Sequence, residues 1–233
     1  MYTTLISVEA LKSISAVVID CSADLAKPEA GRQQFEQQHI ANALFADIHT
    51  DLATHDTALA INGGRHPLPS REHFAKWLGS YGISEHTQVV VYDRQGMNYC
   101  GRLWWMLKAT GHANVQVLDG GLDTWNGPIG TKPRQAIPTN TPVPTMPYFG
   151  LVLVESLVEN LQSKKNVVID ARASDRFHGQ NETLDPVGGH IPDALNYCFR
   201  ENLSGKSFKT PEQLYKDFHD LLGSTKPSEV IHQ

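Results

Sequence analysis

The 233-residue sequence predicts an α/β protein of two tandem domains, each a parallel sheet flanked by helices, with the second domain incomplete. Three observations support this prediction. Short β-branched runs alternate along the chain with segments whose apolar residues recur at helical spacing. The strand-like runs lack polar alternation, as expected of strands buried on both faces. The pattern is present twice, which is typical of a duplicated domain.

The elements of the first half follow in strand–helix–strand order. "AVVID" at 16–20 and "VVVYD" at 89–93 are β-branched strands. Residues 68–83 have a proline near the start, apolar residues at helical spacing and a glycine near the end, so a helix is expected. "GRLWWMLKATG" at 101–111 is a second helix that ends at glycine, and "NVQVLDGG" at 114–121 is another strand with a turn.

Three blocks recur in the same order in the second half. Asp20 and Asp170 hold matching positions, at an offset of 170 − 20 = 150 residues. A single match such as "VVID" is common in α/β proteins, but three ordered matches indicate a duplication. The matched blocks are "AVVIDCSAD" (16–24) with "NVVIDARASD" (166–175), "HIANAL" (39–44) with "HIPDAL" (190–195), and the helical segments 68–83 and 210–224.

Residues 127–150 separate the two copies and contain six of the 13 prolines. This composition does not sustain a helix or an interior strand, so a semi-rigid linker on the surface is expected. The predicted organisation is therefore a first domain at 1–126, the linker, and a second domain at 151–233.

The alignment of the copies places residues 230–231 at the start of a strand. Pro69 and Pro211 align, and Asp93 lies 93 − 69 = 24 positions after Pro69. With one deletion in the second copy, the counterpart of Asp93 is position 234, one beyond Gln233. The second domain is therefore expected to be truncated before the loop that follows Asp93 in the first.

That loop is the candidate functional site. "VVVYD" is a strand, "RQGMNYCG" a short loop with a glycine, and "RLWWML" the start of a helix. Such a loop collects backbone N–H groups in front of a helix N-terminus, where an anion or a nucleophile of lowered pKa is stabilised. In open α/β sheets, ligands bind at the carboxyl ends of the strands, where this loop lies.

These blocks, together with "NVQVLDGGLDTW" and "DARASDRF…GGHIPDALN", resemble the two-domain rhodaneses, which are the thiosulfate and 3-mercaptopyruvate sulfurtransferases. The resemblance covers nearly the whole chain. It implies tandem rhodanese-like domains: a non-catalytic first domain, with Asp93 at the cysteine position, and a second domain whose catalytic cysteine follows residue 233. The 233-residue chain by itself is therefore predicted to be inactive.

The resemblance also implies the reaction. A cysteine thiolate takes the outer sulfur of thiosulfate, or the sulfur of mercaptopyruvate, and becomes a persulfide that passes the sulfur to cyanide or a thiol. Backbone N–H groups of the loop hold the charge of the persulfide. No cofactor is expected, and the choice between the two donors is left open.

Further site residues are implied by the same resemblance. Arg176 matches an arginine that grips the anionic donor, and a guanidinium suits carboxylate and sulfonate-like groups equally. His66, in "GRHPLP", matches a histidine that helps to relay protons in mercaptopyruvate-type members. The cleft between the domains is expected to be bordered by Arg176 and this loop. Asp170 and Arg172 are expected to support the site by ion pairing. Mercaptopyruvate-type members often carry a second arginine a few residues on, and residues 178–189 contain none.

Other polar and aromatic side chains have structural interpretations. Asp47, His49 and Asp51 alternate, as metal ligands on a strand might, but turns and capping explain such residues more often, so no metal is expected. The remaining set comprises the cysteines Cys21, Cys100 and Cys198, interpreted as buried structural thiols, and Trp104 and Trp105 with Leu103 and Leu107, interpreted as helix core.

Composition restricts the partners. A net charge of −5 argues against a broad nucleic-acid surface, and the longest apolar runs are too short to span a membrane. The N-terminus lacks the features of a secretory signal, and three widely spaced cysteines fit reduced thiols in a cytoplasmic protein. The expected partners are a small anionic sulfur donor and a thiol or cyanide acceptor.

Two other functional classes stay open at this point. A rhodanese module without a catalytic cysteine would bind or scaffold partner proteins, and a cysteine at position 234 would favour the enzyme instead. A phosphatase of the related fold needs a longer loop with an arginine after its cysteine, and the short loop after Asp93 argues against that class.

Overall fold

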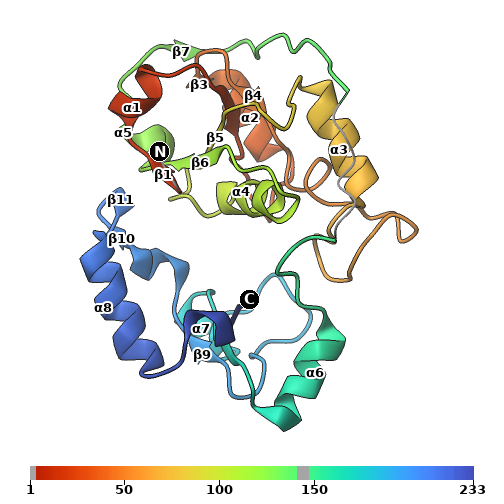
Figure 1. Ribbon diagram of the computed structural model, residues 1–233, viewed down its shortest axis with the longest axis vertical. Coiled ribbons are helices and arrows are strands. Elements are labelled where there is room, and N and C mark those ends of the chain that lie inside the picture. Colours follow the sequence, from red (N-terminus) through yellow and green to blue (C-terminus); the bar gives the residue numbers. More distant parts are fainter. Residues whose placement is uncertain (1–3, 141–146) are drawn as a thin grey trace. The chain divides into compact units, whose positions relative to one another are not determined.

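The computed structural model describes residues 4–140 and 147–233, and the chain divides into two compact units, Met1–Leu151 and Val152–Gln233 (Figure 1). Most of the predicted linker at 127–150 belongs to the first unit by this division, and its residues 141–146 lie outside the described part. Each unit is an α/β structure built on a parallel sheet, as predicted.

The first unit contains a five-stranded sheet in which every neighbouring pair is parallel. Its two central strands β5 and β6 are completely buried, because helices cover both faces. The predicted strands at 16–20, 89–93 and 114–121 are confirmed, whereas the short edge strand β1 was not predicted. The spatial order is β1 (Leu5–Ile6), β6 (Val115–Leu118), β5 (Val89–Tyr92), β2 (Val17–Asp20) and β4 (Leu44–Phe45).

The helices of this unit lie on both faces of the sheet (Figure 1). On one face, Val90 and Tyr92 pack with Leu11 and Phe35, which come from the first two helices. Since side chains alternate along a strand, Val89 and Val91 point to the other face. There α4 packs on β5 and β6. The helices are α1 (Val8–Lys12), α2 (Ala30–Gln37), α3 (Arg71–Ser80), α4 (Cys100–Ala109) and α5 (Gly121–Thr124).

The α4 helix confirms only part of the predicted helix core. Leu103 and Leu107 are fully buried, as expected, and so is Met106. Trp104 and Trp105 are half-buried, because residues adjacent in a helix point about 100° apart and only one stripe faces the sheet.

The described part of the linker is less exposed than its composition predicts. Ile129–Gly130 forms strand β7, which pairs antiparallel with β3 (His39–Ile40). Near the other end, Tyr148 is buried, its ring stacks on Trp105 at 5.8 Å, and its hydroxyl donates to the carbonyl of Pro69 at 3.2 Å. The expectation of a linker that runs over the surface is wrong at these two places, because both ends are anchored to the first unit.

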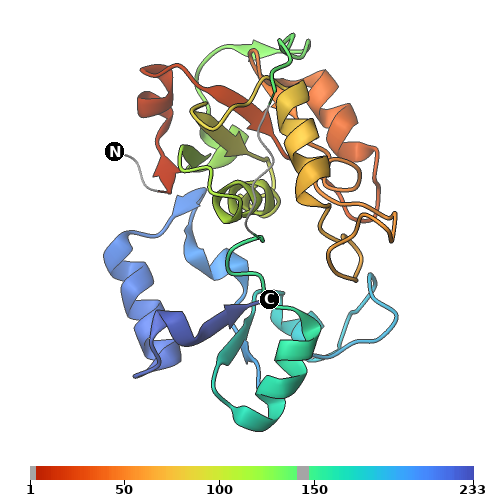
Figure 2. The ribbon, with the colours of Figure 1, turned by 45° about the vertical axis from the view of Figure 1, so that its right-hand side comes forward.

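The second unit has a smaller parallel sheet of order β12-β8-β9, and Figure 2 shows β12 ending at the C-terminus. Its core is small: Val168, Phe177 and Ala194 are the buried residues, flanked by partly buried apolar side chains. The strands are β8 (Val167–Asp170), β9 (Leu195–Asn196) and β12 (Val230–His232), with a hairpin of β10 (Leu203–Ser204) and β11 (Ser207–Phe208). The helices are α6 (Val154–Ser163), α7 (Ser174–Phe177), α8 (Pro211–Leu222) and the 3₁₀ turns η1 (Phe199–Asn202) and η2 (Pro227–Glu229).

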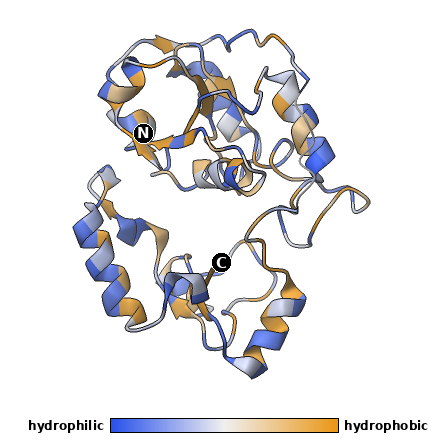
Figure 3. Cartoon of the chain, viewed as in Figure 1, coloured by the Kyte–Doolittle hydropathy of each residue, from blue (hydrophilic) through white to orange (hydrophobic). Residues whose placement is uncertain are grey.

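The α8 helix begins and ends where the sequence predicts. Thr210 and Gln213 form a reciprocal capping box around Pro211 at the first helical position. Gly223 ends the helix with a φ of 58°. Figure 3 shows hydrophobic and hydrophilic residues together along α8, as expected of a helix that packs on one side only.

The ladder beside the central strand has the same register in both units. In the first unit, the N–H of Cys21 donates to the carbonyl of Tyr92 at 2.7 Å. In the second, the N–H of Ala171 donates to the carbonyl of Gln233 at 3.3 Å. Because Cys21 and Ala171 each follow the aspartate that ends the central strand, Gln233 is the geometric counterpart of Tyr92. This register agrees with the sequence alignment, which pairs Asp93 with position 234.

Gly121, in the "DGG" turn after β6, packs directly against the loop that follows β5. Its φ is +56°, and a Cβ at this position would lie 2.2 Å from the carbonyl oxygen of Asp93. The same carbonyl accepts the N–H of Leu122 at 3.0 Å. Glycine is therefore required both for the backbone conformation and for the close approach.

Replacing Gly121 by Ala is expected to destabilise the first unit by about 2–4 kcal/mol, because strain in a left-handed backbone adds to a steric overlap. Urea unfolding followed by tryptophan fluorescence measures this, since all four tryptophans lie in the first unit. Gly111→Ala is the control, because its φ is +91° but the space around a Cβ is open. Equal losses for both variants would contradict the role of close packing at Gly121.

Candidate functional site

Asp93 lies at the end of β5 with its carboxylate buried in a cradle of backbone N–H groups. The loop turns sharply through Gly96 and Met97, which have φ values of 73° and 60°. The residue is fully buried, so the carboxylate charge is stabilised by the loop rather than by water. The donors, at 2.8–2.9 Å, are the N–H groups of Gln95 and Met97 to one oxygen and those of Tyr99 and Cys100 to the other.

This arrangement confirms the nest of N–H groups predicted for the loop. Tyr99 and Cys100 stand at the N-terminus of α4, so two of the four donors belong to the helix end. The loop is therefore an anion-binding cradle, and the side chain of Asp93 itself fills it. An aspartate carboxylate has no sulfur to transfer, so the loop of the first unit holds charge without supplying a nucleophile.

A second buried carboxylate, Asp20, ends the neighbouring strand β2 and pairs with Arg94. The Nη2 of Arg94 lies 3.0 Å from Asp20 and donates to the carbonyl of Gln38 at 2.7 Å. Its Nε donates to Ser22 at 3.0 Å. The guanidinium thus ties together the loops after β5 and β2 and the end of α2.

The second unit has the same type of pair, made from a different loop. Asp170, which ends β8, is fully buried and accepts two Arg172 hydrogen bonds, at 3.0 Å from Nε and 2.6 Å from Nη2. The Nη2 group also donates to the carbonyl of Gly189 at 2.6 Å. The hydrogen bonds to Asp170 raise the pKa of Arg172. Arg172 contacts an aspartate and a carbonyl just before a histidine, as Arg94 does, although Arg172 follows β8 and Arg94 follows β5.

The histidines of the two "HI" blocks make matching contacts. His39 stacks on Phe35 at 3.8 Å, and its Nδ1 is 2.6 Å from the Phe35 carbonyl. His190 stacks on Phe177 at 3.7 Å, and its Nδ1 is 2.8 Å from the Phe177 carbonyl. Only three residues separate the first pair, whereas the twelve residues 178–189 separate the second. The second unit therefore has a longer loop at this place.

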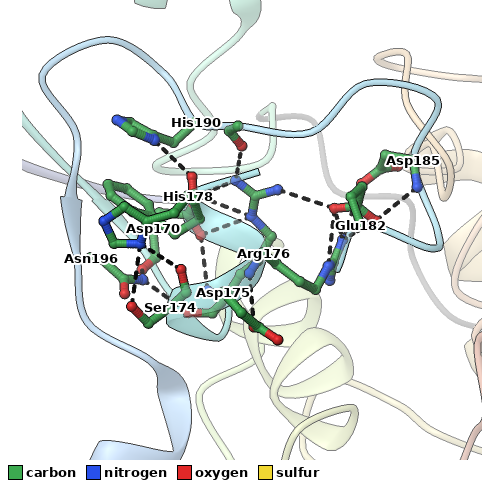
Figure 4. A network of polar contacts seen from close by, with 12 residues as sticks. Asp170, Ser174, Asp175, Arg176, His178, Glu182, Asp185, His190 and Asn196 are labelled. Atoms are coloured by element: carbon green, nitrogen blue, oxygen red, sulfur yellow. Dashed lines mark hydrogen bonds and ion pairs between the residues drawn. The ribbon is translucent and has the colours of Figure 1, made fainter. Parts of the chain in front are cut away.

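This longer loop supplies carboxylates to Arg176, the residue expected to bind the donor (Figure 4). Arg176 Nε and Nη2 contact both oxygens of Glu182 at 2.9–3.1 Å, and Nη2 lies 3.2 Å from Asp185. Glu182 also reaches Arg172 at 3.7 Å. The structure thus joins Asp170, Arg172 and Arg176 in one ionic network, through carboxylates to which the sequence interpretation assigned no role.

Backbone and side-chain donors stabilise the charged form of Glu182. The N–H groups of Asp185 and Leu184 donate to it at 2.9 and 2.8 Å, and its side chain is only 5% exposed. These backbone donors, with Arg176 as a further contribution, lower the pKa of Glu182 from its ordinary value of 4.5 to about 2. The carboxylate is therefore a fixed negative charge at physiological pH.

His66 lies in the first unit, next to His49. The two ring nitrogens, Nε2 of His66 and Nδ1 of His49, are 3.0 Å apart. Arg102 on α4 holds this loop by donating to the carbonyls of Leu52 and His66, each at 2.8 Å. Burial, and secondly His49, lowers the pKa of His66 to about 4, so the imidazole is neutral at pH 7. Its role in proton transfer and its place beside a cleft stay predictions.

The aspartates around His49 cap a turn. Asp47 accepts the N–H of His49 at 2.8 Å, and Asp51 accepts the N–H of Asp47 at 2.9 Å. The residues form turns rather than the extended backbone that would align them on one face. Within residues 4–140 and 147–233, no group of three or more His, Cys, Asp or Glu residues is arranged to hold a metal ion.

The cysteines differ in their exposure. Cys21 and Cys100 are fully buried, as predicted, and burial together with nearby carboxylates raises the pKa of both thiols well above their ordinary value. Such thiols stay protonated and are poor nucleophiles. The expectation of burial is wrong for Cys198, which is half-buried because it begins the short turn η1, none of whose residues is buried.

Asp93→Asn is expected to destabilise the first unit by about 3 kcal/mol or more, because the neutral amide loses the charge-assisted bonds and turns an NH₂ group toward N–H donors. Tryptophan fluorescence in urea measures the loss. Asp24→Asn is the matched control, since Asp24 accepts two N–H groups, from Ala26 and Lys27, at an exposed turn. A loss no larger than that of the control would contradict the fourfold coordination of Asp93.

The low pKa of Glu182 has a pH-dependent consequence. A carboxyl group whose pKa is lowered by folding contributes stability above its unfolded value, and that contribution disappears as the pH falls through the folded value. The loop at 178–189 is therefore expected to lose stability between about pH 4.5 and pH 2. NMR signals of the Leu184 and Asp185 amides should titrate near the lower value. Glu182→Gln should abolish this titration, and a midpoint near 4.5 in the unaltered chain would contradict the contacts described.

Comparison with known proteins supports the resemblance. Residues 7–128 match the rhodanese-like domain family. The chain is 38% identical over 225 residues to 3-mercaptopyruvate sulfurtransferase of Rattus norvegicus, covering 91% of this chain and 73% of that protein. It is 35% identical over 212 residues to thiosulfate sulfurtransferase of Cricetulus griseus, covering 87% and 69%. The fold matches that of 3-mercaptopyruvate sulfurtransferase from Leishmania major with a TM-score of 0.83 at 22% identity, covering 99% and 65%.

The lengths of these relatives exceed the matched region, because the chain spans between 64% and 76% of the curated relatives' length. The family assigned from the duplicated blocks is confirmed by the domain match and by relatives of both sulfurtransferase types. This chain therefore belongs to the two-domain rhodanese family.

Proposed function

We propose that the protein is a sulfurtransferase that moves a sulfane sulfur from thiosulfate or 3-mercaptopyruvate to cyanide or a thiol through a cysteine persulfide. The nucleophilic cysteine is placed at position 234. The observation that carries this proposal is the cradle after β5, in which four N–H groups converge on one anionic side chain. The same loop with a cysteine at its first position would direct those donors at a thiolate and then at a persulfide.

The register of β12 supports position 234 as the place of this cysteine. Gln233 is the counterpart of Tyr92, so the next residue corresponds to Asp93. A helix N-terminus after the loop, as α4 provides in the first unit, would lower the pKa of a thiol there. The buried pair of Asp170 and Arg172 supports the adjacent loop, as Asp20 and Arg94 do in the first unit.

The proposed chemistry has two steps. The thiolate attacks the outer sulfur of thiosulfate, the S–S bond breaks, and sulfite leaves with the bonding electrons. With 3-mercaptopyruvate, the C–S bond breaks and the resulting enolate of pyruvate takes a proton. Cyanide or a thiolate then attacks the terminal sulfur of the persulfide and regenerates the cysteine thiolate. Sulfur is carried without any metal or organic cofactor in this scheme.

Two residues are proposed to handle the donor. Arg176 binds its carboxylate or sulfonate-like group, and His66 relays a proton in the reaction of mercaptopyruvate. The neutral state of His66 at pH 7 supports a proton-relay role, because an uncharged imidazole has one ring nitrogen that can accept. In the first unit, Asp93 keeps the cradle filled, so that unit serves as the structural partner.

A non-catalytic module that binds or scaffolds partners is the second candidate. It is favoured by one observation: in the described part of the chain, the anion cradle holds a carboxylate, and the two most buried thiols have raised pKa values. A residue other than cysteine at position 234 would decide for this candidate. Among the described residues, no helix is long and apolar enough to cross a bilayer. A cytoplasmic location stays a prediction.

Thiocyanate formation from thiosulfate or 3-mercaptopyruvate with cyanide tests the proposal. The full natural chain should turn over and gain the mass of one sulfur atom on Cys at position 234, and replacing that residue by Ser should abolish both. The 233-residue chain should be inactive because it lacks the nucleophile. Cys198→Ser and Cys100→Ser are controls that should retain activity. Turnover by the 233-residue chain that disappears in either control variant would place the nucleophile elsewhere.

A further inference from the structure

We propose that the two carboxylates on Arg176 have separate roles: Glu182 positions the guanidinium, and Asp185 is an exchangeable partner that selects against doubly charged donors. This inference rests on the proposed function, in which Arg176 binds the anionic group of the sulfur donor. Both carboxylates come from the loop 178–189, which is longer than its counterpart in the first unit.

Glu182 has the contacts of a permanent partner. Its two oxygens receive Nε and Nη2 of Arg176 at 2.9–3.1 Å and the backbone N–H groups of Leu184 and Asp185 at 2.8–2.9 Å. Its side chain is 5% exposed, so removing this carboxylate from its donors would leave them without water to replace it. Glu182 therefore fixes the edge of the guanidinium that carries Nε and Nη2.

Asp185 is placed differently. Its side chain is 41% exposed, and the carboxylate lies 3.2 Å from Nη2 of Arg176. An exposed ion pair contributes little to stability, because water solvates both partners when they separate. An anion that approaches from solvent can therefore replace Asp185 at Arg176 without disturbing Glu182.

The guanidinium retains donors for such an anion. In residues 4–140 and 147–233, the Nη1 group of Arg176 makes no hydrogen bond, and the side chain is 22% exposed. Nη1 and the outer side of Nη2 form one edge of the planar group, which suits a carboxylate or sulfonate-like group. The donor would then bind to the edge that Glu182 leaves open.

The charge of the network makes this edge selective. Three carboxylates, Asp170, Glu182 and Asp185, face two guanidinium groups, Arg172 and Arg176, for a net charge of 2 − 3 = −1. Repulsion from this excess grows with the charge of the ligand. The single carboxylate of mercaptopyruvate is therefore favoured over the thiosulfate dianion, even though residues 178–189 contain no second arginine.

The test uses the inert probes sulfate, a dianion, and pyruvate, a monoanion, bound to the full natural chain and followed by NMR at the Arg176 Nε–H. Asp185→Asn should tighten pyruvate binding about threefold and sulfate binding about tenfold, for one charge removed at about 6 Å in water-like surroundings. Glu182→Gln removes the same charge but should give a smaller gain, because Arg176 loses its fixed orientation. Asp220→Asn, an exposed carboxylate paired with Lys216 on α8, is the charge-matched control and should change neither affinity.

Equal gains for the two anions in Asp185→Asn, or no gain, would overturn the selectivity. A gain in Glu182→Gln as large as in Asp185→Asn would overturn the positioning role. If Arg176→Ala leaves both affinities unchanged, the anions bind elsewhere and the donor site itself is wrong. If the binding pattern holds but the full chain transfers no sulfur, the inference stands and the proposed reaction fails.

Discussion

Four backbone N–H groups that converge on one point are the constraint on which the first unit depends. The loop after β5 can turn as it does only if a negative charge accepts all four donors, because buried N–H groups without acceptors are costly. Asp93 meets that requirement from within the loop. The Gly121 turn then packs on its backbone and leaves no room for a side chain. Charge, loop path and the adjacent glycine are therefore one structural solution.

The same requirement separates the proposed roles of the two units. A cradle filled by its own carboxylate is stable and chemically inert, whereas a cradle that begins with a thiolate holds a nucleophile and, after reaction, a charged persulfide. Evolution of a duplicated domain can thus keep the architecture of the loop and change its chemistry at one position. The buried carboxylate–arginine pairs next to the loops serve both units alike.

Arg176 illustrates how a substrate-binding side chain is prepared before substrate arrives. An unpaired guanidinium at a partly buried place would be poorly solvated, so nearby carboxylates stabilise it. The permanent partner Glu182 also fixes the direction of the group, which reduces the ordering needed on binding. The cost is a local excess of negative charge that an anionic donor must overcome. Affinity and specificity at this site are therefore set largely by residues of the 178–189 loop rather than by Arg176 alone.

The sequence by itself determined the family, the α/β class, the principal strands, the capped α8 helix and the place of Asp93 at the end of a strand. These features depend on local pattern: β-branched runs, helical periodicity and turn residues within a few positions of one another. It predicted the N–H nest as well, since a strand, a short glycine loop and a helix form one continuous segment.

Only the tertiary structure decided which partners meet across the chain. Arg94 and Arg172 make the same kind of contact from different loops, and no sequence spacing encodes that equivalence. The pairing of Arg176 with Glu182 and Asp185 depends on the path of a twelve-residue loop, and its extra length was the one available signal. The anchored ends of the Pro-rich linker and the half-buried Cys198 were likewise mispredicted from composition. Long-range contacts depend on how loops close in space, and local residue preferences do not specify that closure.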